Sequence, residues 1–310
     1  MNQYFFFIDD VIWPFRDLSR QRPASIFDHP FLGMLKRMNR QYGLKTQLNI
    51  FFSTDPSYGG EDFDLTQIPD IYREEFRANA SWLRFAFHAE KEFPGYPYVN
   101  ISYDEMKAAY TRVRDEVYRF AGEEVFSHRV LIHYNAISKA GCQALRDCGV
   151  TLLSSTDGAD LPEDYAALSP AARERMLAGR TEETTRPYLK TRSSGETIPA
   201  IRAYNHLSDD MALRCDHSLC AWAGNDLHLP MKEFCHLLLN VHKPQEIERL
   251  LPERITGDFI GIGDHEQYFY PDYARYQPDY EQRIAAACRI MQEKGWQSIR
   301  MDELSFIPIV

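Results

Sequence analysis

The stretch YFFFIDDVIWPFRDL, residues 4–18, decides the expected fold, because an apolar run at residues 4–8 leads directly into two carboxylates, Asp9 and Asp10. An apolar run of this length, without alternation, is typical of a strand that is buried on both faces of a parallel sheet. In parallel α/β folds, functional groups gather at the carboxyl ends of such strands. Asp9 and Asp10 are therefore the first candidate site residues.

Strand and helix signals alternate through much of the remaining chain. Four further apolar stretches in the first half and one late stretch predict strands at residues 45–52, 83–90, 129–135, 150–155 and 258–263. Segments with helical periodicity separate them, and one begins with an S-x-x-E capping box at Ser102 and Glu105. This order predicts the α/β class and a distorted or incomplete (β/α) barrel, with an open doubly wound sheet as the alternative.

Residues 1–310 are expected to form one domain. Residues 156–230 within it are rich in Pro, Gly, Thr and charge and lack the apolar periodicity of a separate core. This segment is predicted to be an insertion that serves as a lid or a dimer arm. It contains CDHSLC at residues 215–220, whose Cys and His side chains offer a structural zinc site as an alternative to a composition without function.

Charge and hydropathy exclude several classes of partner. The net charge of −10 opposes binding to a nucleic acid, and a sugar or a neutral or cationic small molecule fits it better. No apolar stretch approaches the roughly 18 residues of a transmembrane helix, so no membrane association is expected. The first residues lack the basic start of a signal peptide, which predicts a cytoplasmic location.

Three histidines follow or end predicted strands, at His88, His133 and His265. Together with Asp9 and Asp10 they form a set that is typical of metal-assisted hydrolysis. One carboxylate would bind a divalent metal, while the other would stay free as a general base on water. The charge of the metal would also offset the repulsion between two adjacent carboxylates. The competing interpretation is a turn whose Asp residues pair with nearby arginines.

Aromatic side chains cluster near the same predicted rim. The stretch HEQYFYPDYARYQPDY, residues 265–280, holds six rings and includes Glu266 and Tyr268. Trp13 and Tyr134 follow two other strand ends. Aromatic rings stack on the apolar faces of sugars, which predicts a carbohydrate-binding role for Trp13, Tyr134 and Tyr268. Glu266, in the same stretch, is also predicted to bind the substrate. A loop held together by its own aromatic packing is the structural alternative.

These positions resemble the polysaccharide deacetylase superfamily of carbohydrate esterases, whose members fold as distorted (β/α)7 barrels. Three longer stretches are similar to a bacterial branch of it, namely IFDHPFLGMLKRMNRQYGLKTQLNIFF, FAFHAEKEFPGYPYVNISYDE and DHEQYFYPDYARYQPDYEQR. The resemblance implies a metal-dependent deacetylase in which Asp9 is the general base, Asp10 and His88 bind a divalent metal such as zinc, and His265 protonates the departing amine.

The chain departs from the family pattern in two respects. Glu92 occupies the position of the family's second ligand histidine, so Glu92 or His133 is the expected third metal ligand. The arginine motif that steadies the catalytic Asp has no equivalent.

Two alternatives therefore stay open beside the deacetylase. One is a glycoside hydrolase that pairs Asp9 with Glu90 or Glu266. The other is a sugar-binding protein whose catalytic site has decayed.

Overall fold

The structure of the chain is a computed structural model. It describes residues 2–56, 62–93, 97–98, 101–135, 137, 139–154, 159–160, 189–191, 197–201, 222–223, 226–227, 237–255 and 259–303. Most of the predicted insertion at 156–230 lies outside these ranges. Residues 215–220, the alternative zinc site, also lie outside them. None of the helices in the described ranges combines the length and apolar character that a bilayer crossing requires.

A parallel sheet forms the centre of the fold. Six strands lie in the order β12-β13-β1-β2-β3-β4, and β14 pairs with the start of β1. Every one of these pairings is parallel. The strands are β1 (Gln3–Val11), β2 (Thr46–Phe51), β3 (Leu83–Ala89), β4 (Phe126–Ser127), β12 (Leu237–Leu238), β13 (Phe259–His265) and β14 (Gln297–Ile299).

A separate parallel pair, β5 (Arg129–Leu131) and β6 (Leu152–Ser154), lies beside β3. Among the residues that the structure describes, no pairing joins β6 to β12, so the ring of strands is incomplete there. The predicted α/β class with an incomplete barrel is thereby confirmed. Outside the main sheet lie β7 (Ala159–Asp160), β8 (Leu189–Thr191), β9 (Thr197–Ile201), β10 (Trp222–Ala223) and β11 (Asp226–Leu227).

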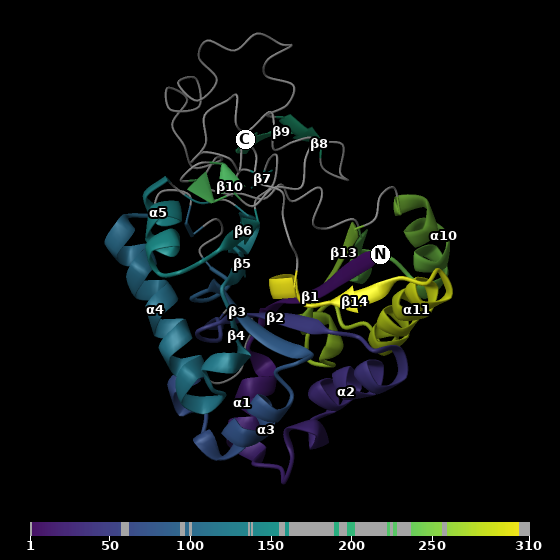
Figure 1. Cartoon of the computed structure of the whole chain (residues 1–310), viewed down its shortest axis with the longest axis horizontal. Coiled ribbons are helices and arrows are strands. Elements are labelled where there is room, and N and C mark those ends of the chain that lie inside the picture. The colour runs from purple at the N-terminus through teal and green to yellow at the C-terminus, as the bar shows by residue number, and fades with distance from the viewer. Residues whose placement is uncertain are drawn as a thin grey trace.

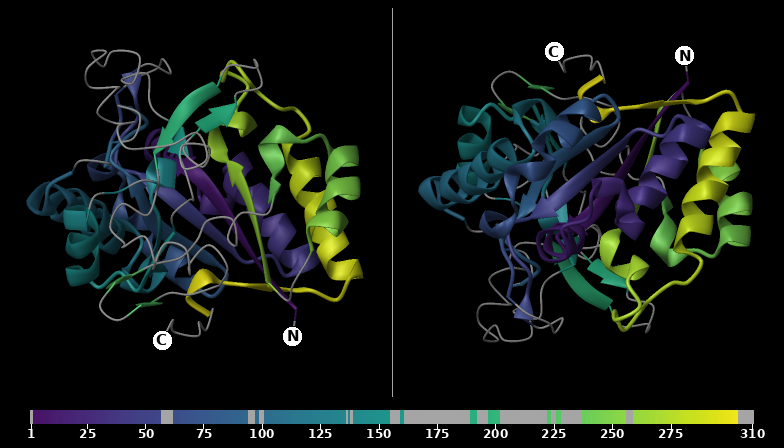
Figure 2. Two further views of the ribbon diagram at one scale, coloured as in Figure 1. Left: turned by 90° about the horizontal axis from the view of Figure 1, so that it is seen from above. Right: turned by 90° about the horizontal axis from the view of Figure 1, so that it is seen from below.

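Helices cover the sheet on opposite flanks. They are α1 (Trp13–Gln21), α2 (Pro30–Tyr42), α3 (Arg73–Ala78), α4 (Tyr103–Phe120), α5 (Lys139–Asp147), α10 (Pro244–Arg254) and α11 (Tyr280–Glu293). In Figure 1, α4 and α5 lie together on one side of the strands, and α10 and α11 lie together on the other. Figure 2 shows the same arrangement from above and below, with the purple strand β1 in the middle.

Local sequence signals explain how the helices begin and end. The capping box at Ser102 and Glu105 is present at the start of α4, as the sequence predicts. Helix α2 ends at Gly43, whose φ of 69° is the left-handed conformation that glycine adopts without strain. The central strand β1 is buried on both faces, in agreement with its apolar sequence, and Phe5, Phe7 and Ile8 are fully inaccessible.

Three predicted strand ends differ from the structure. Strand β1 does not end at Asp9 and Asp10 but continues through them to Val11. Strand β5 ends at Leu131, so the predicted strand at 129–135 is too long, and His133 begins the short 3-10 helix η6 (His133–Asn135). Strand β13 extends two residues past the predicted end and includes His265.

Candidate functional site

Two β-bulges set the positions of the first candidate residues. Between Ile8 and Val11 strand β1 advances three residues while β2 advances two, which places Asp9 and Asp10 in a bulge. On the other side of β2, strand β3 advances from Phe87 to Ala89 against a single step of β2, which leaves His88 as the extra residue. A bulge re-aims the side chains that it carries. Asp10 and His88 therefore meet across β2 instead of following the ordinary alternation.

Asp10, His88 and His133 come together in the interior. Their nearest ligand atoms all lie within 4.8 Å of one another, and all three side chains are buried. Asp10 Oδ1 lies 3.2 Å from His88 Nε2 and 3.4 Å from His133 Nδ1. The two rings meet edge-on, with 3.1 Å between His88 Nε2 and His133 Nδ1. The ring of Phe51 packs against both imidazoles and restricts their orientation.

Backbone carbonyls determine which nitrogen of each ring carries a hydrogen. His88 Nδ1 lies 2.6 Å from the carbonyl of Leu131, and His133 Nε2 lies 3.1 Å from the carbonyl of Glu92. A carbonyl oxygen can only accept, so both of these nitrogens donate. The opposite nitrogens, His88 Nε2 and His133 Nδ1, then present lone pairs toward Asp10 Oδ1 in the neutral rings.

This donor set fits a divalent cation. Asp10 Oδ1 is buried and has no hydrogen-bond donor of suitable geometry among the described residues. Two imidazole lone pairs and one carboxylate oxygen that converge without a shared proton repel each other, and a cation removes that repulsion. Two histidines and one carboxylate are also a ligand set of catalytic zinc sites, which keep a further coordination position open.

The pKa values follow from burial and from the charges in this group. Burial would raise the pKa of Asp10, but the contact with His88 and the charges of His133 and His265 hold it below its ordinary value. Burial opposes protonation of His88, yet the charges of Asp9 and Asp10 raise its pKa to about 9. Burial lowers the pKa of His133 to about 4.

Asp9 lies beside the group but has a different partner. Its Oδ1 accepts a hydrogen bond of 2.6 Å from Asn49 Nδ2 on β2 and lies 4.0 Å from His88 Nδ1. Burial raises the pKa of Asp9. Asp10 is held by another amide, since its Oδ2 accepts from Gln267 Nε2 at 3.0 Å. The two neighbouring carboxylates are thus oriented independently.

His265 reaches Asp10 from the end of β13. Its Nε2 lies 3.9 Å from Asp10 Oδ2, and its Nδ1 lies 3.2 Å from Asn240 Oδ1. Its side chain is 27% exposed, which makes it more accessible than His88 or His133. The partly exposed ring of His265 therefore borders the space above Asp10.

That space is a cavity of about 680 Å³. Four predicted site residues besides Asp10 line it, namely Glu92, Tyr134, His265 and Tyr268. Further lining residues, which were not among the predicted site residues, are Gln267, Asp272, Tyr273, Ala274 and Arg275. Asp9, His88 and His133 are buried next to Asp10, so Asp10 connects the group of ligands with the open cavity.

Three predicted residues, Glu92, Trp13 and Glu266, do not join the group of Asp10, His88 and His133. Glu92 is not in the three-residue group, because its Oε2 lies 3.9 Å from His133 Nε2, on the ring edge that faces away from Asp10 Oδ1. Trp13 packs edge-on against Tyr270 and is not among the lining residues of the cavity. Glu266 is fully buried and accepts hydrogen bonds from the backbone nitrogens of Ile12 and Trp13.

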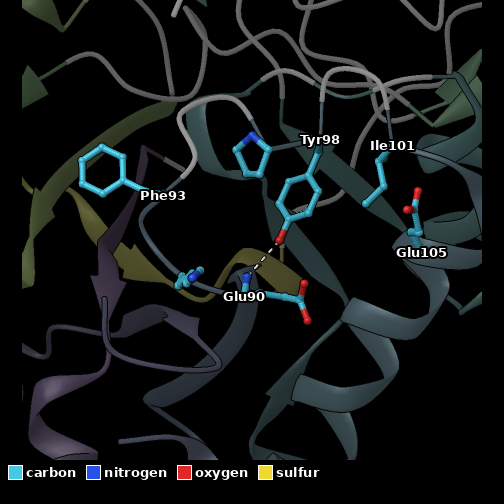
Figure 3. Close-up of a pocket in the computed structure, with 7 residues that line it drawn as sticks. Glu90, Phe93, Tyr98, Ile101 and Glu105 are labelled. Atoms are coloured by element: carbon cyan, nitrogen blue, oxygen red, sulfur yellow. Dashed lines mark hydrogen bonds between the residues drawn. The ribbon is translucent and has the colours of Figure 1, made fainter. Parts of the chain in front are cut away.

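A second cavity, of about 390 Å³, lies on another side of the segment that follows β3. Its lining residues are Glu90, Lys91, Phe93, Pro97, Tyr98, Ile101 and Glu105. Figure 3 shows the Tyr98 hydroxyl directed at Glu90, whose backbone nitrogen donates to it at 2.9 Å. The carboxylate of Glu90 forms an ion pair with Arg112 at 3.0 Å. Glu90 therefore lines a different cavity from Asp10.

The amides that hold the two carboxylates were not among the predicted site residues. Gln47 and Asn49 alternate with the apolar residues Leu48 and Ile50 in a buried strand, and this pattern indicates buried polar contacts. Gln267 and Asn240 lie in segments that also contain other polar residues, so nothing in the sequence singled them out.

No protein-family model matches the chain. A search of curated proteins likewise finds no match.

Solved structures show distant similarity. A 4-α-glucanotransferase from Thermococcus litoralis is 14% identical with a TM-score of 0.46, and the match covers 97% of this chain but only 40% of the enzyme's length. A family 4 acetyl xylan esterase from Clostridium thermocellum, in complex with a cobalt ion, is 8% identical with a TM-score of 0.40, covering 97% and 89% of the two chains. A mutant CE4 family pseudoenzyme with restored enzymatic activity is 8% identical with a TM-score of 0.41, covering 98% and 67%. Similarity at this level carries no conclusion about activity.

Proposed function

We propose that this protein is a metal-dependent hydrolase that removes an acetyl group from a carbohydrate. The observation that carries the proposal is the convergence of Asp10, His88 and His133 next to a cavity of about 680 Å³. The backbone contacts of both histidines leave their inner nitrogens available as ligands. We expect a divalent metal at these three residues, with zinc as the first candidate because of the donor set.

When bound, a divalent cation supplies positive charge that polarises an acyl oxygen and acidifies a water molecule. Asp9 is the proposed general base, because its side chain is 12% exposed and lies beside the ligand group without being part of it. His265 is the proposed acid for the departing group, since its exposed ring lines the cavity.

Tyr134 and Tyr268 are the proposed sugar-binding residues. Both line the cavity together with Tyr273. Their rings offer apolar faces for a pyranose and their hydroxyls offer hydrogen bonds. Polar partners that hold the acetyl group in place are expected among the residues near Asp10.

The glycoside hydrolase alternative requires a second carboxyl group that faces the same substrate as Asp9. Glu266 directs both oxygens to the backbone of α1, and Glu90 lines the second cavity. Neither placement favours this alternative.

The test combines metal analysis with an acetate-release assay on acetylated sugars and oligosaccharides. Wild-type protein is expected to bind one divalent ion per chain and to release acetate. Asp10→Asn should lose both the metal and the activity. Asp9→Asn should keep the metal and lose roughly 10²- to 10⁴-fold in rate, the usual contribution of a general base.

Asp115→Asn is the matched control, because it removes one exposed carboxylate on α4 that pairs with Arg114. It should change neither metal content nor activity. Wild-type protein that binds no divalent ion above background would refute the proposal. Release of reducing sugar ends without acetate would favour the glycoside hydrolase.

A further inference from the structure

Strand β2 carries two buried amides in the middle of the fold. Gln47 and Asn49 lie two residues apart and therefore on the same face of the strand, and their exposures are 2% and 0%. Burying an amide without hydrogen bonds is costly, so such groups persist where they are satisfied. The contacts of these two amides are therefore informative.

The amides form a chain with a fixed direction. Gln47 Nε2 lies 3.1 Å from the carbonyl of Arg129 and 2.8 Å from Asn49 Oδ1. Because the Arg129 carbonyl can only accept, the nitrogen of Gln47 must face it, and the oxygen of Asn49 must then face Gln47. The nitrogen of Asn49 is thereby directed at Asp9 Oδ1, at 2.6 Å.

This chain engages one oxygen of Asp9 and leaves the other. No hydrogen bond to Asp9 Oδ2 is found among the described residues, and the side chain of Asp9 is 12% exposed. Asp10 differs, because Gln267 holds its Oδ2 while its Oδ1 faces two histidines. Asp9 and Asp10 therefore have the same side chain but different hydrogen-bond partners.

We propose that Asn49 is a positioning residue for Asp9, with Gln47 as its support, so that Asp9 Oδ2 points toward the reacting water. This inference rests on the proposed function in which Asp9 is the general base. Asn49 acts on the reaction through Asp9 and touches no substrate.

The decisive variant is Asn49→Leu, which keeps the branching and the number of heavy atoms of the side chain but removes the donor. We expect kcat to fall roughly 10- to 100-fold, because a misplacement of a catalytic group by about 1 Å can cost about 10²-fold in rate. KM should stay within about threefold, because the substrate contacts are unchanged. Metal content should equal that of wild type, since Asn49 contacts no proposed ligand atom. Gln47→Leu should give a smaller fall in kcat.

Thr46→Val is the matched control on the same strand. Thr46 is buried, and its hydroxyl has no hydrogen-bond partner among the residues that the structure describes. Removing it should leave kcat, KM and metal content unchanged. If Asn49→Leu does not fold, Asn49→Ala removes the same donor without adding bulk and replaces it in all measurements.

A second readout does not depend on activity. Crystal structures of wild type and Asn49→Leu should show the Asp9 carboxylate displaced by about 1 Å or more, a shift that suffices to impair catalysis. An unmoved Asp9 would overturn the inference, as would a kcat that falls only in proportion to lost metal. If wild-type protein releases no acetate, the proposed function fails, and the displacement of Asp9 still decides whether Asn49 positions it.

Discussion

Asp10 combines two unfavourable features, a strained backbone conformation and a buried carboxylate. Its φ of 63° is in the left-handed region, which a residue with a Cβ enters only with strain, and its carboxylate is buried. Conformational strain of this kind costs about 1–3 kcal/mol and persists where the surroundings enforce it. Here Gln267 holds one oxygen, and the bulge in β1 holds the backbone. Such a combination is typical of a functional residue.

The strain at Asp10 can be measured by comparing Asp10→Gly with Asp10→Ala. Both variants remove the carboxylate, but only glycine adopts a φ of 63° without strain. Asp10→Gly should therefore have a free energy of unfolding about 1 kcal/mol higher than Asp10→Ala. Chemical denaturation of the two metal-free variants checks this. Equal stabilities, or a more stable alanine variant, would show that the backbone at Asp10 is not strained.

At the scale of elements, the sequence predicted the regular parts of the fold. The apolar runs of β1 and β3 and the capping box of α4 follow local rules, and each is present. Periodicity assumes that side chains alternate without interruption, so it could not predict the bulges at Asp10 and His88. The candidate residues were identified by type and position, but which of them meet depended on those irregularities. His133, which lies in η6, completes the group, and Glu92 does not.

The short helix η10 (Glu266–Phe269) links the end of β13 to the start of α1. Glu266 accepts from the backbone nitrogens of Ile12 and Trp13, at 2.8 Å and 3.1 Å, and so caps a helix from 253 or more residues away in sequence. Its neighbour Gln267 holds Asp10. One turn of chain therefore supports both the proposed metal ligand and the helix that follows it.

Burial raises the pKa of Glu266 from 4.5 to about 8, which makes stability depend on pH. Between these values the folded protein keeps a proton that the unfolded chain releases, so the free energy of unfolding falls as the pH rises. Glu266→Gln should flatten this decline by at most about 1.4 kcal/mol per pH unit. Urea denaturation between pH 5 and 8, at roughly half-unit steps, measures the slope. The exposed Glu253→Gln should leave the slope unchanged, and an equal change in both variants would contradict the role of Glu266.

At the scale of the whole molecule, the proposed ligands come from three distant segments. Asp10 lies in β1, His88 in β3 and His133 in η6, so the group joins the two strands on either side of β2 with the chain after β5. Without a cation, burial opposes protonation of His88, but the charges of Asp9 and Asp10 raise its pKa to about 9 and favour a proton between His88 and Asp10. A cation held by these three residues would therefore connect β1, β3 and η6.

Removing the metal should therefore destabilise the whole fold. A ligand that binds only the folded state increases the free energy of unfolding by RT ln(1 + [L]/Kd), which is about 2.7 kcal/mol at a free metal concentration of 100 Kd. Chelator-treated protein should have a lower Tm, and Zn²⁺ should restore it in a concentration-dependent manner. When Zn²⁺ is added to the metal-free protein, hydrogen exchange of the backbone amides should slow most in β1, β3 and the segment around His133, because these segments carry the proposed ligands. Asp10→Asn should abolish both responses, whereas Asp115→Asn should preserve them. A Tm that rises equally in Asp10→Asn would mean that the ion stabilises the protein from another site.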